Sequence, residues 1–401
     1  MRLVRFTTLD HLAPWAAAWN RLAGGVPFRA WEWLSAWWRC YGQADTRAEL
    51  NVLGVFAEDG TLVGVAPWFL HRSRRLGWTI RFLGTGEVCS DYLAILAAPG
   101  LEDAVAETLA EWLVEQNRAN VGRPSQADQD DLGRPSNKLQ NPSGGRRDST
   151  LHPWDLFEVS GVEGTDRTTK RLIELLALHG HAIHSRPATR CWRVNLPEHW
   201  DTYEAMLSHS HRKQVRRLNR QYLATGRAQI HTVTRAEELE RAAHFLIDLH
   251  QRRQRAVGQP GCFASDPFRE FHLAVMPWLL QTGRLRLHWL ELDGRPIAAE
   301  YHIAGEGVVY AYQAGIEPDA LEHEPGRLAT MATLQAAIER GYSSYDFLRG
   351  DEPYKAHWRA EPRRLLEVCV VPDKAAARFR YGVWTAGKSV KQWIKGRLAA
   401  R

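Results

Sequence analysis

Apolar and polar residues alternate with two different periods along the chain, and this mixture predicts an α/β protein. Short runs with a period of two residues are typical of strands, whereas apolar residues every three or four positions are typical of helices. In the first half these patterns predict strands at Leu50–Phe56, Leu62–Phe69, Ser90–Leu96 and Trp154–Val159, and helices at Ala30–Cys40, Leu101–Asn117 and Arg167–His179.

The second half repeats this mixture. Helices are predicted at Asp201–Thr225, Ala236–Val257, Pro267–Gln281 with a break near Pro277, and Gly326–Arg340; strands are predicted at Arg284–Leu292, Ile297–Ala304, Val308–Ile316, Ser344–Leu348 and Arg364–Val371. Each half has an Asp-Gly hairpin turn and later a strand with Asp before an aromatic residue: Asp59-Gly60 and Asp91-Tyr92, then Asp293-Gly294 and Asp346-Phe347. We therefore expect two copies of one α/β unit.

The length of 401 residues fits about two or three domains. We place an N-terminal unit at residues 1–190, a C-terminal unit at residues 191–372, and a basic C-terminal helix or tail at residues 373–401. Residues 118–150 are rich in Gly, Pro, Ser, Asn and Asp and contain almost no apolar residues. Such a segment buries too little surface to offset the entropy of ordering, so it is predicted to be a disordered insertion.

Charge and cysteines narrow the class of protein. The formal net charge of +6 is modest, and we expect no DNA partner from it. The five cysteines lie far apart without metal-ligand or redox spacing, and the histidines of His179–His184 have no acidic or cysteine neighbours, so no metal is expected. The N-terminus lacks an apolar signal core, and no apolar run reaches the roughly 20 residues that span a bilayer, so we expect a cytoplasmic protein with reduced thiols.

The start of the helix Gly326–Arg340 is a candidate site for a phosphate-bearing cofactor. Pro325 and Gly326 stand where the helix begins, and Arg327 follows. The first turn of a helix has unpaired N–H groups and a partial positive charge, and glycine lets a ligand approach the backbone closely. A pyrophosphate cradle and an ordinary helix start, where proline is common, both fit this sequence.

Charged and aromatic residues gather just after the next strand. YDFLRGDEPYKAHW begins as a buried strand with Asp346 and continues with Arg349, Asp351, Tyr354 and Lys355. Ligands of α/β sheets collect at the carboxyl ends of strands. In a ligand site Lys355 could hold an anion, Tyr354 could donate a proton and Asp351 could orient an amine or hydroxyl. A salt-bridge cluster that closes the turn is the structural alternative.

The strand Ile297–Ala304 carries a further candidate pair. Glu300 and His302 share one of its faces, because side chains alternate along a strand. A carboxylate beside an imidazole could include a general base. A solvated outer face explains the same alternation, and the sequence alone favours that explanation.

The segment Ser208–Arg227 concentrates positive charge without an acidic residue. Cations spaced along one face of the expected helix, or beside it, are Arg212, Lys213, Arg216, Arg217 and Arg220. A helix that is merely solvated usually mixes charges. We therefore expect this face to grip a polyanion: the phosphates of a cofactor, of RNA or of a nucleotide-linked sugar.

The tail from Lys374 is also basic and is predicted to be helical. It has no acidic residue, and Phe379, Val383, Val390 and Ile394 fall roughly along one face. Such a helix can lie on an anionic membrane surface or pack on the body of the protein, and we favour packing.

Longer stretches of both halves resemble a known family. LHQRRQRAVGQPGCF, RLRLHWLELDGRPIAAEYHIAGEGVVYAYQAGI and EPGRLATMATLQAAIERGYSSYDFLRGDEPYKAHW, with PFRAWEWLSAWWRCYG, DGTLVGVAPWFL and SDYLAIL from the first half, resemble the branch of GNAT-type acyltransferases associated with cellulose biosynthesis. That branch is similar to the Fem-type aminoacyl transferases. The resemblance implies an α/β (α+β) fold of tandem GNAT-like units, each a mixed twisted sheet flanked by helices.

The resemblance also implies a donor site and a reaction. In GNAT enzymes a splayed strand and the start of the next helix hold acyl-CoA, which here corresponds to Val308–Ile316 and to Gly326, Arg327 and Leu328. The loop is poor in glycine, which leaves room for another acyl donor. The expected activity is an N- or O-acyltransferase that moves an acyl group from acetyl-CoA or another acyl-CoA to an amine or hydroxyl. The acceptor would be a small molecule or glycan precursor, for example for envelope polysaccharide or exopolysaccharide.

We assign the candidate residues to three roles on chemical grounds. They are catalytic (Glu300, Asp351, Tyr354), donor-binding (Gly326, Arg327, Leu328, Arg212, Lys213, Arg216) and acceptor-binding (His302, Asp346, Arg349, Lys355, Trp358). Glu300 or Asp351 would be the base and Tyr354 the acid. Two other functions stay open: a Fem-type transferase that takes an aminoacyl group from tRNA, and a non-catalytic GNAT-fold scaffold with a membrane contact through the tail.

Overall fold

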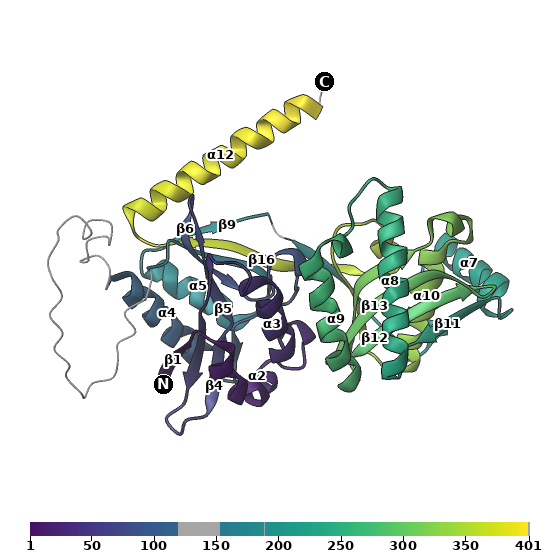
Figure 1. Ribbon diagram of the computed structural model, residues 1–401, viewed down its shortest axis with the longest axis horizontal. Coiled ribbons are helices and arrows are strands. Elements are labelled where there is room, and N and C mark those ends of the chain that lie inside the picture. The colour runs from purple at the N-terminus through teal and green to yellow at the C-terminus, as the bar shows by residue number, and fades with distance from the viewer. Residues whose placement is uncertain (119–152, 188, 400–401) are drawn as a thin grey trace.

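The computed structural model describes residues 1–118, 153–187 and 189–399, with side chains placed as far as Gly387 in the last helix (Figure 1). Apart from Arg118, the insertion predicted at residues 118–150 lies outside the described residues.

The first half contains five helices and nine strands in its described part. The helices are α1 (Leu9–Leu12), α2 (Ala16–Leu22), α3 (Trp31–Trp37), α4 (Glu102–Arg118) and α5 (Arg167–Leu178). The strands are β1 (Arg2–Phe6), β2 (Ala48–Leu50), β3 (Val52–Phe56), β4 (Leu62–Ala66), β5 (Trp68–Ser73), β6 (Gly77–Phe82), β7 (Leu96–Ala97), β8 (Leu156–Glu163) and β9 (Ala182–Ser185).

The second half also mixes helices and strands. Its helices are α6 (Trp200–Met206), α7 (His209–Leu218), α8 (Ala236–Ala256), α9 (Asp266–Gln281), α10 (Pro325–Glu339), α11 (Tyr354–His357) and α12 (Ala375–Ala399). Its strands are β10 (Arg190–Asn195), β11 (Ala228–Thr232), β12 (Leu285–Leu292), β13 (Arg295–Gly305), β14 (Val308–Ile316), β15 (Ser344–Arg349) and β16 (Glu361–Val371).

Two strands predicted in the first half are each two strands that belong to different sheets. The prediction for Leu50–Phe56 breaks at Asn51, and that for Leu62–Phe69 breaks at Pro67. Proline has no N–H for a sheet ladder, and the Asn51 side chain accepts a hydrogen bond from Arg5 Nε at 2.7 Å. At Asn51 the chain therefore crosses from the larger sheet into a four-stranded sheet, β1-β3-β4-β7, and at Pro67 it crosses back.

Other predicted elements have different limits. Of the strand predicted at Ser90–Leu96, only the end forms β7. The helix predicted at Asp201–Thr225 is interrupted after Met206, where the Ser208 side chain accepts from the N–H of His211 and starts α7. In contrast, α9 continues through Pro277 without the predicted break.

The large sheet is nearly symmetric about its centre. In the described residues it has twelve strands in the order β11-β12-β13-β14-β15-β10-β16-β8-β6-β5-β2, with β9 beside β16. Outward from the centre, β15-β14-β13-β12 matches β8-β6-β5-β2. The pairs β14–β15 and β6–β8 are parallel, whereas the neighbouring strand pairs are antiparallel. The two predicted copies of one unit are thus joined edge to edge.

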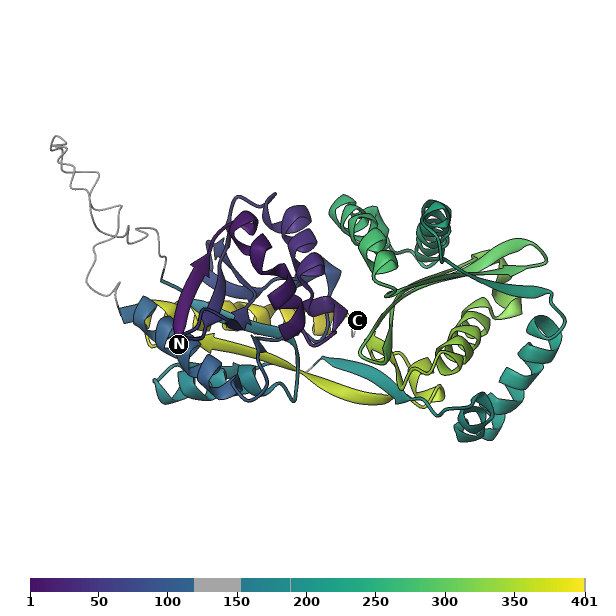
Figure 2. The ribbon, with the colours of Figure 1, turned by 90° about the horizontal axis from the view of Figure 1, so that it is seen from below.

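Strand β16 joins the two copies. Its first residues pair with β10, with Arg193 opposite Glu361, and its later residues pair with β8, with Val370 opposite Phe157. Figure 2 shows this long strand running from one lobe into the other. The last strand of the predicted C-terminal unit is therefore also part of the first unit's sheet, and the domain limits at residues 190 and 372 stay a prediction.

Helices cover both faces of the second half's sheet (Figure 2). Ala299, Tyr301 and Ile303 of β13 face the core that includes α8 and α9, whereas Ala298 faces the core that includes α10. The face that carries Glu300 and His302 is therefore covered by a helix. The prediction that this face is solvated, which the sequence favoured, is wrong. Both residues are buried, with exposed fractions of 8% and 0%.

A cluster of buried polar groups connects the halves at the centre of the sheet. Asp346 Oδ2 accepts from Tyr92 OH at 2.5 Å and from Arg193 Nε at 2.7 Å. Arg349 binds Asp91 through Nε at 2.8 Å. The two Asp-aromatic sequences, one in each half, thus contact each other: Asp91 binds Arg349, which follows Asp346 by three residues, and Asp346 binds Tyr92, which follows Asp91.

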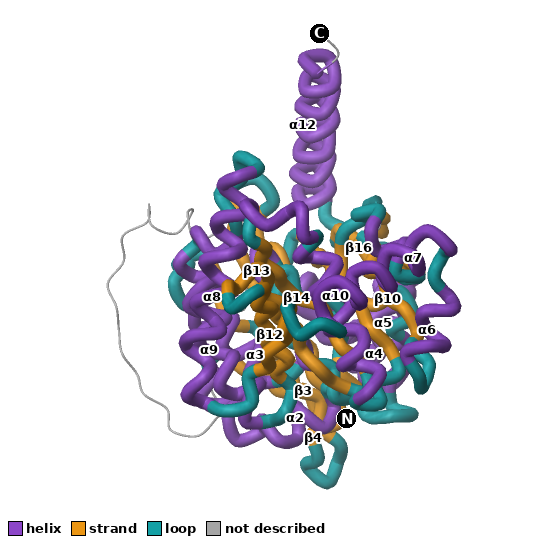
Figure 3. Tube along the Cα trace, turned by 90° about the vertical axis from the view of Figure 1, so that its right-hand side faces the viewer, coloured by secondary structure: helices purple, strands orange, loops and turns teal. Residues whose placement is uncertain are grey.

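Helix α12 extends away from the rest of the molecule (Figures 1 and 3). Only its first turns contact the body, through Ala377, Tyr381 and Trp384. No helix in the described part of the chain is long and apolar enough to cross a bilayer.

The contact between the halves predicts a stability effect. Tyr92→Phe removes one donor from the buried carboxylate of Asp346, and we expect it to lower the free energy of unfolding by about 1–3 kcal/mol in urea denaturation. Tyr222→Phe is the matched control, because its hydroxyl bonds only within the second half, to Gln221 and His323. Equal losses in the two variants would show that the contact between the halves has no special weight.

Candidate functional site

Strands β14 and β15 separate after a short parallel pairing. The paired residues of β14 are Val308, Val309 and Tyr310, which lie opposite Ser344, Tyr345 and Asp346 of β15. Beyond these pairs the two strands no longer pair with each other, although β14 continues to Ile316 and β15 to Arg349. The separation has a local cause: Asp346 Oδ1 accepts from the N–H of Leu348 at 2.8 Å, and Leu348 has a positive φ of 55°. This turn bends β15 away from β14 and leaves backbone groups of β14 without a strand partner.

A cavity of about 710 Å³ opens beside the separated strands. Its walls come from β13, β14, α10, β15 and the turn after it, with one side chain each from α7 and α8; the lining includes Glu300, Ala311–Ala314, Ile316, Gly326, Arg327, Thr330, Tyr345, Phe347, Arg349, Tyr354, Trp358, His211 and Arg253. Half of the predicted site residues are thus brought to one place, although they come from segments far apart in sequence: Glu300, Gly326, Arg327, Arg349, Tyr354, Lys355 and Trp358.

The start of α10 forms part of this cavity and has free backbone donors. Pro325 has no N–H, and the N–H of Leu328 bonds to Glu324 within the helix, so the N–H groups of Gly326 and Arg327 are left without helical acceptors. A Cβ placed on Gly326 would meet nothing closer than Ile316 Cγ2 at 3.8 Å, so the space beside it is open. The geometry fits a diphosphate at this point. The Leu328 side chain lies in the core and does not line the cavity.

Two basic side chains of the cavity wall were missed by the sequence reasoning. His211 is 6% exposed, its ring packs edge-on against Trp358 at 4.5 Å, and its Nε2 has no hydrogen-bond partner among the described residues. Burial, then the nearby Arg327, lowers the pKa of His211 to about 4. Arg253 of α8 also lines the cavity and forms no ion pair with a described acid. The sequence showed both residues only as members of basic helices, with no sign of which ones turn inward.

A chain of hydrogen bonds runs from the cavity into the core. Glu300 Oε2 and Tyr345 OH each lie 3.2 Å from His302 Nε2, and Tyr345 OH lies 3.3 Å from Thr333 Oγ1. Burial, then the nearby Glu300 carboxylate, raises the pKa of Tyr345 well above its usual value. Within this series of hydrogen bonds, Glu300 is the carboxylate that lines the cavity. His302 lies deeper in the core and positions Glu300.

Tyr354 and Trp358 also line the cavity, as expected for site residues. Burial, then the nearby Glu300, raises the pKa of the Tyr354 phenol. The phenol is therefore protonated throughout the neutral range and is available as a donor. Trp358 is 2% exposed, and the His211 ring packs against its indole.

The remaining charged residues of the turn hold the structure together. Asp351 lies outside the cavity wall, where it binds Arg190 at 2.8 Å and Trp192 Nε1 at 3.0 Å. The Lys355 ammonium lies 2.8 to 3.2 Å from the carbonyl oxygens of Leu348, Arg349 and Gly350. The structural alternative considered for this turn thus describes the contacts of both Asp351 and Lys355. Lys355 also lines the cavity, which Asp351 does not, and its predicted role in holding an anion stays a prediction.

The basic face of α7 is largely neutralised by groups that lie elsewhere in the sequence. Arg212 donates to the carbonyls of Glu204, Ala205 and Leu207 at 2.6 to 3.0 Å, and so caps α6. Arg216 binds the Glu204 carboxylate at 2.5 Å.

Arg217, a further cation of this face, forms an ion pair with Glu324, the residue just before α10. Lys213 and Arg220 remain exposed, with no ion pair to a described acid. Arg212, Arg216 and Arg217 thus already have contacts within the protein, and the expectation that this face grips a polyanion stays a prediction.

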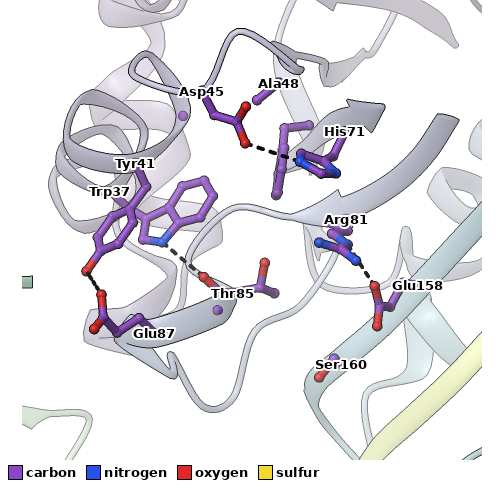
Figure 4. Close-up of a pocket in the computed structure, with 13 residues that line it drawn as sticks. Trp37, Tyr41, Asp45, Ala48, His71, Arg81, Thr85, Glu87, Glu158 and Ser160 are labelled. Carbon is purple, nitrogen blue, oxygen red and sulfur yellow. Dashed lines mark hydrogen bonds and ion pairs between the residues drawn. The ribbon is translucent and has the colours of Figure 1, made fainter. Parts of the chain in front are cut away.

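The first half repeats the strand separation and has its own cavity of about 440 Å³ (Figure 4). Pairing of β6 with β8 stops after Ile80 and Phe157. The charged side chains bond to one another across this cavity, as the dashed lines in Figure 4 show: His71 Nε2 to Asp45 at 3.2 Å, Arg81 Nε to Glu158 at 2.7 Å, and Tyr41 OH to Glu87 at 3.2 Å. It resembles the second cavity in position, but its charged groups largely satisfy one another.

Comparison with known proteins gives a match over the part of the chain that holds the 710 Å³ cavity. Residues 209–356 match the family model of the acetyltransferase (GNAT) domain. The match includes the separated strands, the start of α10 and most of the cavity wall, and it covers less than half of the chain. A comparison with curated proteins found no match.

Solved structures are similar over nearly the whole chain. FemX is 10% identical, covers 92% of this chain and 97% of its own, and has a TM-score of 0.56. A protein of unknown function from Bacteroides thetaiotaomicron is 10% identical, covers 92% and 100%, and has a TM-score of 0.51. At these identities the likeness is one of fold, and the predicted α/β fold of tandem GNAT-like units is confirmed. The branch associated with cellulose biosynthesis stays a prediction.

The low pKa of His211 predicts a pH dependence of stability. Its pKa is about 4 in the folded protein against 6.5 in the unfolded chain, so between these pH values the unfolded state binds more protons and stability falls as the pH is lowered. His211→Gln should flatten this part of the profile of unfolding free energy against pH. The exposed His209→Gln is the control, and identical profiles for the two variants would contradict the burial of His211.

Proposed function

We propose that the second unit transfers an acyl group from an acyl-CoA thioester to an amine or hydroxyl acceptor. The observation that carries the proposal is the cavity where β14 and β15 separate, directly beside the free N–H groups of α10. A separated strand offers unpaired backbone groups to an extended donor, and a helix start offers N–H groups to its diphosphate. The match of residues 209–356 to the GNAT acetyltransferase domain supports the same reaction class.

Different residues of the cavity would bind different parts of the donor. The N–H groups of Gly326 and Arg327 would meet the diphosphate, and the unpaired cation of Arg253 would add charge at the same opening. His211 is neutral at pH 7 because its pKa is about 4, so it would act there as a hydrogen-bonding group. Backbone N–H groups of β14 would polarise the thioester carbonyl.

Glu300 is the proposed general base and Tyr354 the proposed acid. The acceptor nitrogen or oxygen attacks the thioester carbon and gives its proton to the Glu300 carboxylate. The tetrahedral intermediate then breaks the carbon–sulfur bond, and the Tyr354 phenol protonates the leaving thiolate. His302 is a positioning residue, since its imidazole holds Glu300 at 3.2 Å from within the core.

Aminoacyl-tRNA is the second candidate donor, and fewer observations support it than support acyl-CoA. The likeness to FemX is one of fold. Among the described residues, Lys213 of α7 and Arg220 of the turn after it are exposed cations without an ion pair to an acid, whereas Arg212 donates to backbone carbonyls. Bulk tRNA is therefore the comparison ligand in the binding experiment below. A small-molecule or glycan-precursor acceptor, including one for polysaccharide biosynthesis, belongs to the same proposal.

Filling the space beside Gly326 tests the donor site. Gly326→Phe places a ring in open space within a helix, so the fold should be kept while binding of acetyl-CoA and of a longer acyl-CoA is lost in calorimetric titration. Gly382→Phe, also in a helix with open space, should bind like the natural protein. If neither thioester gives heat with the natural protein while tRNA does, the donor is aminoacyl-tRNA; if nothing binds, the protein is a scaffold.

Removing the proposed base tests the chemistry separately from binding. Glu300→Gln should lower the rate of thiol release from acyl-CoA, measured with a panel of amines and amino sugars, by about 10²–10⁴-fold while donor binding is unchanged. Asp351→Asn is the matched control and should keep full activity, because Asp351 lies outside the cavity. Full activity in both variants would remove Glu300 from the mechanism.

A further inference from the structure

The β5–β6 hairpin and the first turns of α12 form a basic surface on the first half. They enclose a hollow of about 1310 Å³, which we call the basic hollow. Its cations are Arg47, Arg72, Arg74, Arg75, Arg81, Lys374 and Arg380, and its one acidic residue is Asp155. Three of these cations are paired with acids (Arg47, Arg81 and Arg380), and the hollow keeps an excess of positive charge.

Several of these cations are not neutralised by the protein. Arg380 binds Asp155 at 3.0 Å, and Arg47 binds Asp45 at 2.9 Å. Arg74 and Arg75, at the tip of the hairpin, are exposed and form no ion pair with a described acid. Folded proteins rarely hold several like charges together without a partner, because the repulsion is unfavourable.

Apolar side chains lie exposed beside this charge. Phe379 and Val383 of α12 are 72% and 58% exposed, and their spacing of four residues places them on one stripe of the helix. The opposite side of the helix packs on the body through Ala377, Tyr381 and Trp384. The packing contacts of the described side chains are in the first turns, and the helix then extends away from the molecule (Figures 1 and 3).

We propose that the basic hollow and α12 dock the protein on a membrane surface that contains anionic lipids. A helix with an apolar stripe and flanking cations lies in the plane of a bilayer interface, with the stripe among the acyl chains and the cations at the headgroups. The lipid phosphates complement Arg74 and Arg75, and the interface receives Phe379 and Val383. RNA would meet the cations equally well but would leave both apolar side chains in water, so the combination favours a membrane. The remaining sequence of α12 adds Lys388, Lys391 and Lys395 and no acidic residue.

Sedimentation of the full-length protein with vesicles tests this proposal. We expect binding to vesicles of phosphatidylcholine and phosphatidylglycerol in equal amounts, little binding to pure phosphatidylcholine, and weakening with salt. Each neutralised cation should weaken binding about fivefold, so Arg74→Gln/Arg75→Gln should weaken it about 30-fold. Phe379→Ser/Val383→Ser should also weaken binding but should leave its salt dependence in place.

Matched variants separate this surface from other surfaces of the protein. Lys213→Gln/Arg220→Gln removes one charge from α7 and one from the turn after it, and Leu321→Ser removes a 46% exposed apolar side chain from the second half. Both variants should bind vesicles like the natural protein. An equal loss in the α7 variant, equal binding to both kinds of vesicle, or no binding to either would overturn the proposal. Salt-sensitive binding of an RNA oligonucleotide without vesicle binding would also overturn it and would assign the hollow to nucleic acid. Calorimetric acyl-CoA binding, measured in parallel, should be unchanged in the Arg74→Gln/Arg75→Gln and Phe379→Ser/Val383→Ser variants, which separates this surface from the proposed transferase site.

Discussion

The buried carboxylate of Asp346 is the interaction on which the rest of the structure depends. It stands in the last residue pair that joins β14 to β15, and its two oxygens do different things. One oxygen accepts the N–H of Leu348 and so turns β15 out of the sheet, which creates the cavity. The other accepts from Tyr92 of the first half and from Arg193 of the central strand β10, which joins the halves. Burial raises the pKa of Asp346, and these donors oppose that effect. One side chain thus links the opening of the site to the joining of the units.

This arrangement explains why residues with suggestive chemistry divide into two groups. Groups that point into the cavity, such as Glu300 and Tyr354, have bonding capacity left for a ligand. Groups at the strand end, such as Lys355 and Asp351, are used to close the turn that the ligand would meet. Tyr354 lies within three residues of both Asp351 and Lys355 in the sequence, and only their surroundings distinguish them.

The sequence predicted much of the fold but only part of the site, and the reason is the range of the interactions. Helices and the meander of β12, β13 and β14 follow from local periodicity, and their observed limits are close to the predicted ones. The start of α10 was also found, because proline and glycine act locally. The partners of Arg349 and Asp346 lie in the first half, and the acids that neutralise α7 lie in α6 and before α10. No local pattern identifies such partners. The burial of His302 likewise depends on α10 covering a sheet face that the sequence cannot show to be covered.

The sharing of β16 has a consequence for how the chain reaches its structure during synthesis. Strand β8 pairs with β16, so Glu163 must wait for Leu365, which the ribosome makes much later. Until then one edge of the first unit's sheet is open, and unpaired edges of this kind are prone to aggregate. The first half would therefore emerge as an unfinished sheet that needs protection by a chaperone or by transient contacts. Its completion would coincide with the arrival of the strand that also completes the second half, so both units would become native in a single late step.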